Sequence, residues 1–224
     1  ILTARAFDTA GNQSTVSSDF DLTVMNSGPS TSISSIDISD DTGASATDFE
    51  TNTASQTITA TLSAGLATGD ILYGSVDGGS TWNDISNKAS GTAITWDNAT
   101  LSGTSSIQFK VTDAAGNDGT VASQSYVLDI TGPSTTPVVT GISDDTGSSN
   151  SDGITADNQL VISGTAGAND AVEVFIDGTS IGTTTADGSG DWSFDHTGTT
   201  LTDNDYILTA RAFDTAGNQS TVSS

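Results

Sequence analysis

The chain of 224 residues carries 28 acidic and four basic residues, a formal net charge of −24, and no cysteine. Nucleic acid and anionic membrane surfaces are excluded as partners, because both bind clusters of lysine and arginine. No disulfide links parts of the chain, and no apolar stretch approaches the length that crosses a bilayer, so we expect no membrane insertion.

Repeats determine the domain organisation. The first eighteen residues, ILTARAFDTAGNQSTVSS, recur letter for letter as residues 207–224. Inside this long period, residues 38–43 (ISDDTG) recur as residues 142–147, at an offset of 104. Internal repetition of this kind is the signature of a tandem array. The predicted parts are the terminal strands of a preceding repeat at 1–27, a first repeat at 28–131, and a second repeat at 132–224 that lacks its last strand.

The opening segment is expected to supply strands to another unit. Residues 1–24 correspond to the last two strands of a repeat, whereas the second repeat stops before the counterpart of Asp19–Val24. We therefore predict that Asp19–Val24 completes the second repeat of a neighbouring chain by strand addition, or that the sequence is a window on a continuous array.

The first repeat alternates apolar and polar residues, which is typical of half-buried strands. Asp77-Gly78 is a predicted hairpin turn. Trp96 is expected in the core, and Trp82 is expected to cap a hairpin. The alternating apolar positions are Ile58, Ala60 and Leu62, followed by Ile107, Phe109 and Val111.

The second repeat shows the same alternation. Asp177-Gly178 and Asp187-Gly188 are predicted turns in which glycine supplies a positive φ. Trp192 is expected in the core. The alternating positions are Leu160 and Ile162, then Val172, Val174 and Ile176, then Leu208, Ala210 and Ala212. No segment carries a helical stripe, so each repeat is predicted to be an all-β antiparallel sandwich of about seven strands.

Three motifs resemble one family. They are Asp-Asp-Thr-Gly at 40–43 and 144–147, Asp-x-Ala-Gly-Asn at 113–117 and 214–218, and a Tyr-Val-Leu-Asp-Ile-Thr-Gly-Pro exit at 126–133. In this order and spacing they resemble the immunoglobulin (Ig)-like tandem repeats of giant RTX-type biofilm adhesins, which are secreted by the type I route and depend on calcium. The resemblance implies tandem Ig-like antiparallel β-sandwiches in an elongated array, located outside the cell at the bacterial surface.

The same resemblance implies calcium at the junctions between units, and the residue types agree. Calcium prefers six to eight hard oxygen ligands, from carboxylates, carbonyls and water. In an Ig-type sandwich the loop after the first strand and the exit of the last strand share one pole, which would face the Asp-x-Ala-Gly-Asn loop of the next unit. The implied calcium residues are Asp40, Asp41, Asp48, Asp113, Asn117, Asp129, Asp144, Asp145, Asp152, Asp214 and Asn218.

A purely structural role is the alternative for these residues. Asp, Asn and Gly are common in turns because they tolerate left-handed backbone and bond their own amides. For the Asp-x-Ala-Gly-Asn loops, turn and metal roles both stay open. For Asp-Asp-Thr-Gly the metal role is favoured, because two adjacent carboxylates at one pole repel unless a cation lies between them. The linker at 23–29 has no aspartate where Asp129 stands, so a site that needs this residue is incomplete there.

Enzymatic activity is not expected. Residues 75–82 fit the Asp-box pattern of sialidases, which in those enzymes is a hairpin device without a catalytic group. A sialidase needs several arginines for its anionic substrate, and this chain has only Arg5 and Arg211. The single histidine, His196, lies near a predicted strand end, and no nucleophile-elbow or phosphate-loop motif occurs.

Two non-enzymatic functions remain. The first is an extender, in which calcium-rigidified repeats project a distal adhesive region for cell adhesion or biofilm formation. Its partners are the neighbouring repeats of the same chain. The second is direct recognition of glycan or protein ligands by the sandwich loops. Aromatic residues make up only 6% of the chain and mostly occupy predicted core positions, which favours the extender.

Overall fold

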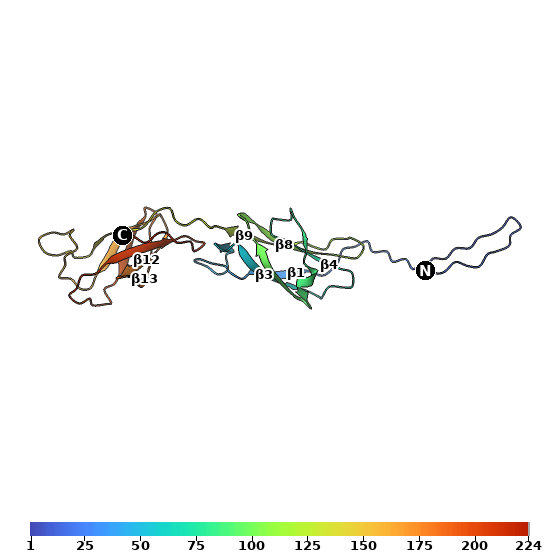
Figure 1. Cartoon of the computed structure of the whole chain (residues 1–224), viewed down its shortest axis with the longest axis horizontal. Helices are drawn as coiled ribbons and strands as arrows, with labels where there is room; N and C mark the ends of the chain where they lie inside the picture. The colour runs from blue at the N-terminus through green and yellow to red at the C-terminus, as the bar shows by residue number, and fades with distance from the viewer. Residues whose placement is uncertain (224) are drawn as a thin grey trace.

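A computed structural model describes residues 1–223. The molecule is elongated and has three parts in line (Figure 1). A ribbon formed by residues 1–27 extends from one end, unit 1 (residues 28–131) lies in the middle, and unit 2 (residues 132–223) lies at the other end. Within the described residues there is no α-helix, and the strands pair in antiparallel sheets apart from one short parallel pair, so the predicted all-β class is confirmed.

Unit 1 is a two-sheet sandwich. The first sheet has the order β1-β3-β7-β6, and the second has the order β2-β9-β8-β4-β5. The strands of the first sheet are β1 (Ile33–Ile38), β3 (Ser55–Leu62), β7 (Ala93–Thr100) and β6 (Ala89–Ser90). Those of the second are β2 (Glu50–Thr51), β9 (Ala122–Leu128), β8 (Thr104–Thr112), β4 (Ile71–Ser75) and β5 (Asn83–Asp84), with a 3₁₀ turn, η1 (Ser86–Lys88), beside them.

The core of unit 1 follows from the alternation. Every second side chain of β3 and β8 points between the sheets, and the predicted positions from Ile58 to Leu62 and from Ile107 to Val111 are all buried. Trp96 packs edge-on against Phe109, with ring centroids 6.0 Å apart. Tyr126 of β9 closes the core and donates its hydroxyl to the carbonyl oxygen of Val76 at 2.7 Å.

Unit 2 has two sheets of three strands, ordered β10-β11-β14 and β13-β12-β15. Trp192 is buried between them, as predicted. Among residues 132–223 no strand equivalent to β2 or β9 pairs with the second sheet. The strands are β10 (Val138–Ile142), β11 (Val161–Thr165), β14 (Asp191–Asp195), β13 (Thr179–Thr185), β12 (Ala171–Ile176) and β15 (Leu208–Phe213).

The turn predictions are confirmed in two of three cases. Asp177 and Gly178 have φ of 51° and 75° and join β12 to β13. Gly78 has a φ of 70°. The prediction for Gly188 is wrong, because the positive φ of that turn, 91°, belongs to Gly190. Asp187 explains the difference: its Oδ1 accepts the amides of Ser189 and Asp191, which makes a longer turn with Gly190 at the left-handed position.

The ribbon is a hairpin without a core. Isolated bridges pair Leu2 with Phe20 and Phe7 with Gln13, and the loop Asp8–Asn12 forms its tip. Phe7, Phe20 and Leu22 are each more than half exposed. The ribbon therefore has the local structure of two paired strands but buries almost none of their apolar surface.

Candidate functional site at the junction between the two units

The Asp-Asp-Thr-Gly motif forms one loop shape in both units. In unit 1 the carbonyl oxygen of Asp40 accepts the Thr51 hydroxyl at 2.6 Å, and Thr42 Oγ1 accepts the amide of Asn52 at 2.9 Å. In unit 2 the carbonyl oxygen of Asp144 accepts the Thr155 hydroxyl at 2.6 Å. Thr146 Oγ1 likewise accepts the amide of Ala156 at 2.7 Å. The motif thus specifies a loop held by its own side chains at the pole of each unit.

The Asp-x-Ala-Gly-Asn motif forms a second loop, at the opposite pole. Asp113 Oδ1 accepts the amides of Ala115 and Asn117, each at 2.9 Å, and its Oδ2 accepts the Asn117 side-chain amide at the same distance. These hydrogen bonds, led by that from the Asn117 side chain, lower the pKa of Asp113 below its ordinary value of 3.8. Asp214 likewise accepts the backbone amide of Asn218 at 2.8 Å and its side-chain amide at 2.9 Å. The aspartate carboxylates of this motif therefore already accept hydrogen bonds from amides of their own loops.

The two loops meet across the junction. Thr42 Oγ1 donates to the carbonyl oxygen of Ala216 at 2.7 Å, and the amide of Ala44 donates to that of Thr215 at 3.2 Å. Gly43 lies between these bonds with a φ of 94°, and a Cβ on it would come within 2.0 Å of the Thr215 oxygen. Only glycine fits this position, because both the backbone conformation and the close approach exclude a side chain.

The linkers pack against the same loops. Asn218 donates its side-chain amide to the carbonyl oxygen of Asp129 at 2.8 Å, and Asn117 does so to that of Met25 at 3.1 Å. The Gly-Pro-Ser glycines lie beside them. A Cβ on Gly28 would be 2.0 Å from the Asp118 carbonyl oxygen, and one on Gly132 would be 2.7 Å from that of Gln219. Each linker is therefore pressed onto the unit that follows it.

One carboxylate oxygen per unit is buried without a partner. Asp41 Oδ2 accepts the amide of Phe49 at 3.1 Å, but Asp41 Oδ1 is buried and has no hydrogen bond. Burial raises the pKa of Asp41, the carboxylates of Asp48 and Asp37 raise it further, and the Phe49 amide opposes them. Asp48 is held beside Asp41 by the bond that its Oδ1 accepts from the amide of Glu50, at 3.1 Å.

Unit 2 repeats this arrangement. Asp145 Oδ2 accepts the amide of Gly153 at 3.0 Å, and Asp152 Oδ1 accepts that of Ile154 at 3.1 Å. Asp145 Oδ1 is again buried and unpaired. A hollow of about 350 Å³ lies here, and both carboxylates line it. Because the same oxygen is left without a partner at positions 104 residues apart, the feature belongs to the motif.

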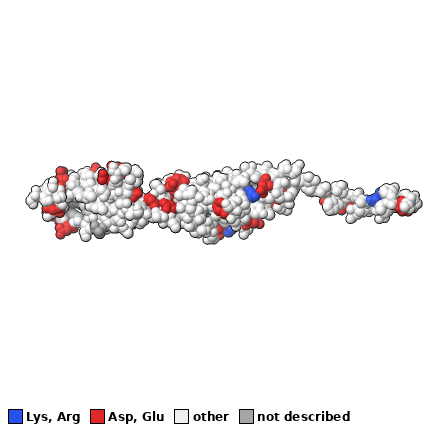
Figure 2. Space-filling view, turned by 90° about the horizontal axis from the view of Figure 1, so that it is seen from above, with Lys and Arg blue, Asp and Glu red and all other residues white. Residues whose placement is uncertain are grey.

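The remaining predicted ligands lie at the same poles. Asp40 Oδ2 accepts the Ser39 hydroxyl at 2.8 Å, and Asp129 Oδ1 accepts the amide of Thr131 at 2.9 Å. Figure 2 shows acidic side chains at the narrow region between the two units. Within residues 1–223, however, no three His, Cys, Asp or Glu side chains converge as a metal-binding group. The structure brings together Asp41 with Asp48, and places Asp145 with Asp152 in one hollow.

The sequence analysis missed the direct contact between the units. From the sequence, the Asp-Asp-Thr-Gly motif was assigned a role through its two aspartates, as metal ligands. In the structure, Thr42 and Gly43 of this motif make the contact with unit 2. The available signal was that threonine and glycine keep the 104-residue offset, as Thr146 and Gly147. A loop whose function depended only on its carboxylates would not need the threonine and the glycine at the same two positions in both units.

Comparisons with known proteins support the sandwich assignment. A model described as a bacterial Ig-like domain matches residues 25–130, and a second model of the same description matches residues 134–224. No curated protein matches the chain. A solved structure titled as structural insight into host cell surface retention of a 1.5-MDa bacterial ice-binding adhesin is similar over 96% of this chain and 69% of that one, with 23% identity and a TM-score of 0.35. Family membership therefore rests on the two family models.

Among residues 1–223 there is no helix that is long and apolar enough to cross a membrane. Both halves of the chain combine a two-sheet sandwich with a match to a model of the same description. The two units are accordingly bacterial Ig-like domains.

Proposed function

We propose that this chain is a spacer segment of a bacterial surface adhesin, in which stacked Ig-like units hold a distal adhesive region away from the cell for adhesion or biofilm formation. Bacterial Ig-like domains are typically structural and non-enzymatic, which agrees with this role. The observation that carries the proposal is the interlocking of the Thr42-Gly43-Ala44 segment with the Thr215–Gly217 loop of the next unit.

The junction limits rotation of one unit against the other. Domains joined by a flexible linker move freely unless their interface holds them. Here two hydrogen bonds join the loops, a third ties the linker to Asn218, and Gly43 and Gly217 are in close approach. The contact is heterologous, since the pole of one unit meets the opposite pole of the next, and such contacts extend an array in one direction.

Unit 2 presents the same contact surface at its far pole. Thr146 and Gly147 stand where Thr42 and Gly43 stand in unit 1, and a Cβ on Gly147 would have nothing within 4 Å. The surface that receives the next unit is therefore preformed. A chain built from such units can add length without adding a new kind of contact.

Calcium is proposed to strengthen each pole. Asp41 and Asp48 would hold it in unit 1, with Asp40 and Asp129 beside them, and Asp144, Asp145 and Asp152 are the equivalents in unit 2. The unpaired oxygens of Asp41 and Asp145 support this ligand set, because a buried carboxylate without a partner is costly and a cation offsets that cost. In this proposal bound calcium has an electrostatic role alone: it would supply the positive charge that offsets the buried carboxylates. Asp113, Asn117, Asp214 and Asn218 face the same junctions, but their polar groups already serve their loops.

Scattering and melting measurements test the proposal. Calcium at a hundred times its Kd would stabilise the folded state by about 2.7 kcal/mol, which is several degrees in Tm for units of this size. Adding millimolar calcium to chelator-treated protein is expected to raise Tm. It is also expected to bring the small-angle scattering profile closer to that of a stiff, extended rod. Asp41→Asn, which keeps the shape of the side chain, should abolish part of the rise, whereas Asp191→Asn at an exposed strand end should not.

The two parts of the proposal can fail separately. A Tm that does not change with calcium would refute the metal while leaving the stacked junction intact. A scattering profile of two independently moving units, with calcium and without it, would refute the spacer role.

A further inference from the structure

The loop of unit 1 that meets unit 2 is held at its base by the buried side chain of Gln56. This side chain is 1% exposed, and its carboxamide bonds both main-chain groups of Asp40. Gln56 Oε1 accepts the Asp40 amide at 2.9 Å, and Nε2 donates to the carbonyl oxygens of Asp40 at 3.1 Å and Thr53 at 2.7 Å. A buried amide bonded in this way keeps one arrangement, because a shift would leave a polar group without a partner. Asp40 is thereby fixed two residues before Thr42, which makes the contact with unit 2.

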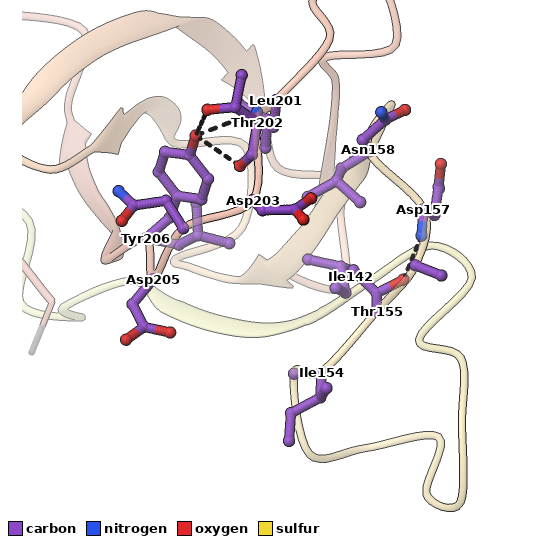
Figure 3. A pocket seen from close by; sticks show the side chains of 15 residues that line it. Ile142, Ile154, Thr155, Asp157, Asn158, Leu201, Thr202, Asp203, Asp205 and Tyr206 are labelled. Carbon is purple, nitrogen blue, oxygen red and sulfur yellow. Dashed lines mark hydrogen bonds between the residues drawn. The ribbon is translucent and has the colours of Figure 1, made fainter.

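Unit 2 has a leucine at this position. The 104-residue offset maps Gln56 onto Leu160, which is buried and has no group that can bond the main chain of Asp144. Figure 3 shows the segment that precedes Leu160, in which the amide of Asp157 donates to Thr155 Oγ1 at 2.9 Å. Unit 1 makes the same turn at the equivalent residues. The difference between the two units therefore begins at the core position that follows this turn.

The base of the loop also has a different backbone conformation in the two units. Asp144 has a φ of 48°, in the left-handed region, whereas its equivalent, Asp40, does not have a positive φ. The left-handed region is uncommon for residues other than glycine, although aspartate tolerates it better than most. The loop of unit 2 therefore starts from a conformation that Leu160 cannot hold by hydrogen bonds.

A second position differs at the surface of the contact. Asn52 Oδ1 lies 3.2 Å from Thr42 Oγ1, and its Nδ2 would lie 3.7 Å from a Cβ on Gly217 of unit 2. The Asn52 side chain thus lies beside its own loop and beside the loop of the next unit. The equivalent residue of unit 2 is Ala156, whose methyl group fills less of this space and makes no hydrogen bond.

The linkers differ at a third position. Asp129 Oδ1 accepts the amide of Thr131 at 2.9 Å, which closes a turn inside the linker that leads into unit 2. The offset maps Asp129 onto Met25 in the linker at 23–29, which leads into unit 1. Methionine has no carboxylate to accept the amide of Ser27, the equivalent of Thr131. The linker into unit 1 therefore cannot close the same turn.

Two kinds of joint follow from these differences. The linker at 23–29 comes after residues 1–18, which are identical to residues 207–224, so in a continuing array it leads from a unit 2 to a unit 1. Joint A, from unit 1 to unit 2, and joint B, from a unit 2 to a unit 1, share the threonine and glycine of the contact. They differ at three equivalent positions, which are Gln56, Asn52 and Asp129 in joint A and Leu160, Ala156 and Met25 in joint B.

We propose that an array with the spacer function described above has joints of unequal stiffness, in which joint A is rigid and joint B bends. Joined domains move relative to each other unless their interface restrains them, and joint A has the more extensive restraint. In joint A a buried amide fixes the loop, an asparagine lies at the contact, and a carboxylate closes a turn in the linker. The units therefore move in pairs, and each long period of the array has one flexible point. Such an array keeps most of its length while its distal region stays free to change direction.

Spin labels measure the stiffness of joint A in this chain. The sequence has no cysteine, so Thr95→Cys in unit 1 and Ser193→Cys in unit 2, both at exposed strand positions, supply one label pair. Gln56→Leu, Asn52→Ala and Asp129→Met together give joint A the residues of joint B. This variant should broaden the distribution of label distances and raise the fraction of bent molecules by about fivefold or more, the factor that one net hydrogen bond supplies. The measurement is made in chelator, so that calcium does not contribute.

Controls separate the joint from the stability of unit 1. Gln124→Leu with Asn83→Ala makes similar changes in the second sheet, away from the junction, and should leave the distance distribution as in the wild type. If Gln56→Leu lowers the melting temperature of unit 1, Asn52→Ala with Asp129→Met, both outside the core, should still broaden the distribution. An unchanged distribution in the triple variant, with unit 1 folded, would overturn the proposal.

A chain in which residues 1–206 precede residues 1–224 contains both joints. Labels at Thr95 and Ser193 of one period span joint A, and labels at Ser193 of the first period and Thr95 of the second span joint B. We expect the broader distribution across joint B. Equally narrow distributions would overturn the alternation and leave the spacer function standing. Equally broad distributions, typical of freely jointed units, would refute the spacer function as well.

Discussion

The segments 1–17 and 207–223 have the same sequence and the same hairpin but opposite surroundings. In the ribbon, Ser14 donates its amide to Ala6 at 2.9 Å and Ser17 to Ala4 at 2.8 Å; in unit 2, Ser220 bonds Ala212 and Ser223 bonds Ala210 at the same distances. Yet Ala4 and Ala6 are exposed, whereas Ala210 and Ala212 are fully buried.

This difference separates local from tertiary causes. The hairpin forms twice because its turn and its short side-chain bonds are encoded within seventeen residues. Burial occurs once because only the second copy pairs with β12, through all six residues of β15. Burial of apolar surface is the dominant favourable term in folding, so the second copy stabilises unit 2, whereas the first copy buries almost no apolar surface within residues 1–223.

The largest expected effect comes from a charge placed in both copies. Ala210→Asp should destabilise unit 2 by roughly 3–5 kcal/mol, because the carboxylate would be buried without a partner. Ala4→Asp makes the same change in the exposed ribbon and should leave both units unaffected. Urea unfolding followed through Trp192 for unit 2 measures the difference. Equal effects of the two substitutions would show that the copies do not differ in burial.

A smaller effect is expected where equivalent glycines differ in their neighbours. Gly43 and Gly147 have φ of 94° and 105°, so alanine at either position should cost about 1 kcal/mol in backbone strain. Only the Cβ of Gly43→Ala would collide with the Thr215 oxygen of the next unit. Gly43→Ala should therefore also broaden the distribution of angles between the units, measured by residual dipolar couplings. If Gly147→Ala broadened it equally, the contact at Gly43 would not be what holds the junction.

The smallest effect concerns the two arginines. Arg211 pairs with Glu173 at 2.6 Å in a half-buried contact and stacks on Phe175 and Phe213, so Arg211→Met, which retains apolar packing, should cost about 1 kcal/mol. Arg5→Met, at the identical position of the ribbon, should cost nothing measurable.

The stability that the Arg211–Glu173 ion pair contributes depends on pH. Burial raises the pKa of Glu173, but hydrogen bonds from Ser180 and Arg211 outweigh it and bring the pKa below the ordinary 4.5. A lowered carboxyl pKa contributes stability above the unfolded-state value, and this contribution is lost as the pH falls. The difference in urea midpoint between wild type and Arg211→Met should thus shrink as the pH drops below that value. A difference independent of pH would assign the effect to packing alone.

Much of the fold was accessible from the sequence because its signals are short-range. Alternation identified the buried faces of β3, β8 and β12, and Trp96 and Trp192 fill the cores as predicted. The turn at Asp187 was misplaced because the choice between Gly188 and Gly190 depends on which amides the carboxylate accepts. The calcium set stays a prediction, for which Asp41 and Asp145 now offer the strongest support.

The sequence by itself determined that the molecule is an array, where its strands lie, and which loops recur, because repetition and alternation can be read along the chain. Only the tertiary structure decided that Thr42 meets Ala216, 174 residues away, and that one hairpin is buried and its twin exposed. These features depend on which distant surfaces come into contact, and identical sequences carry no information about their own neighbours.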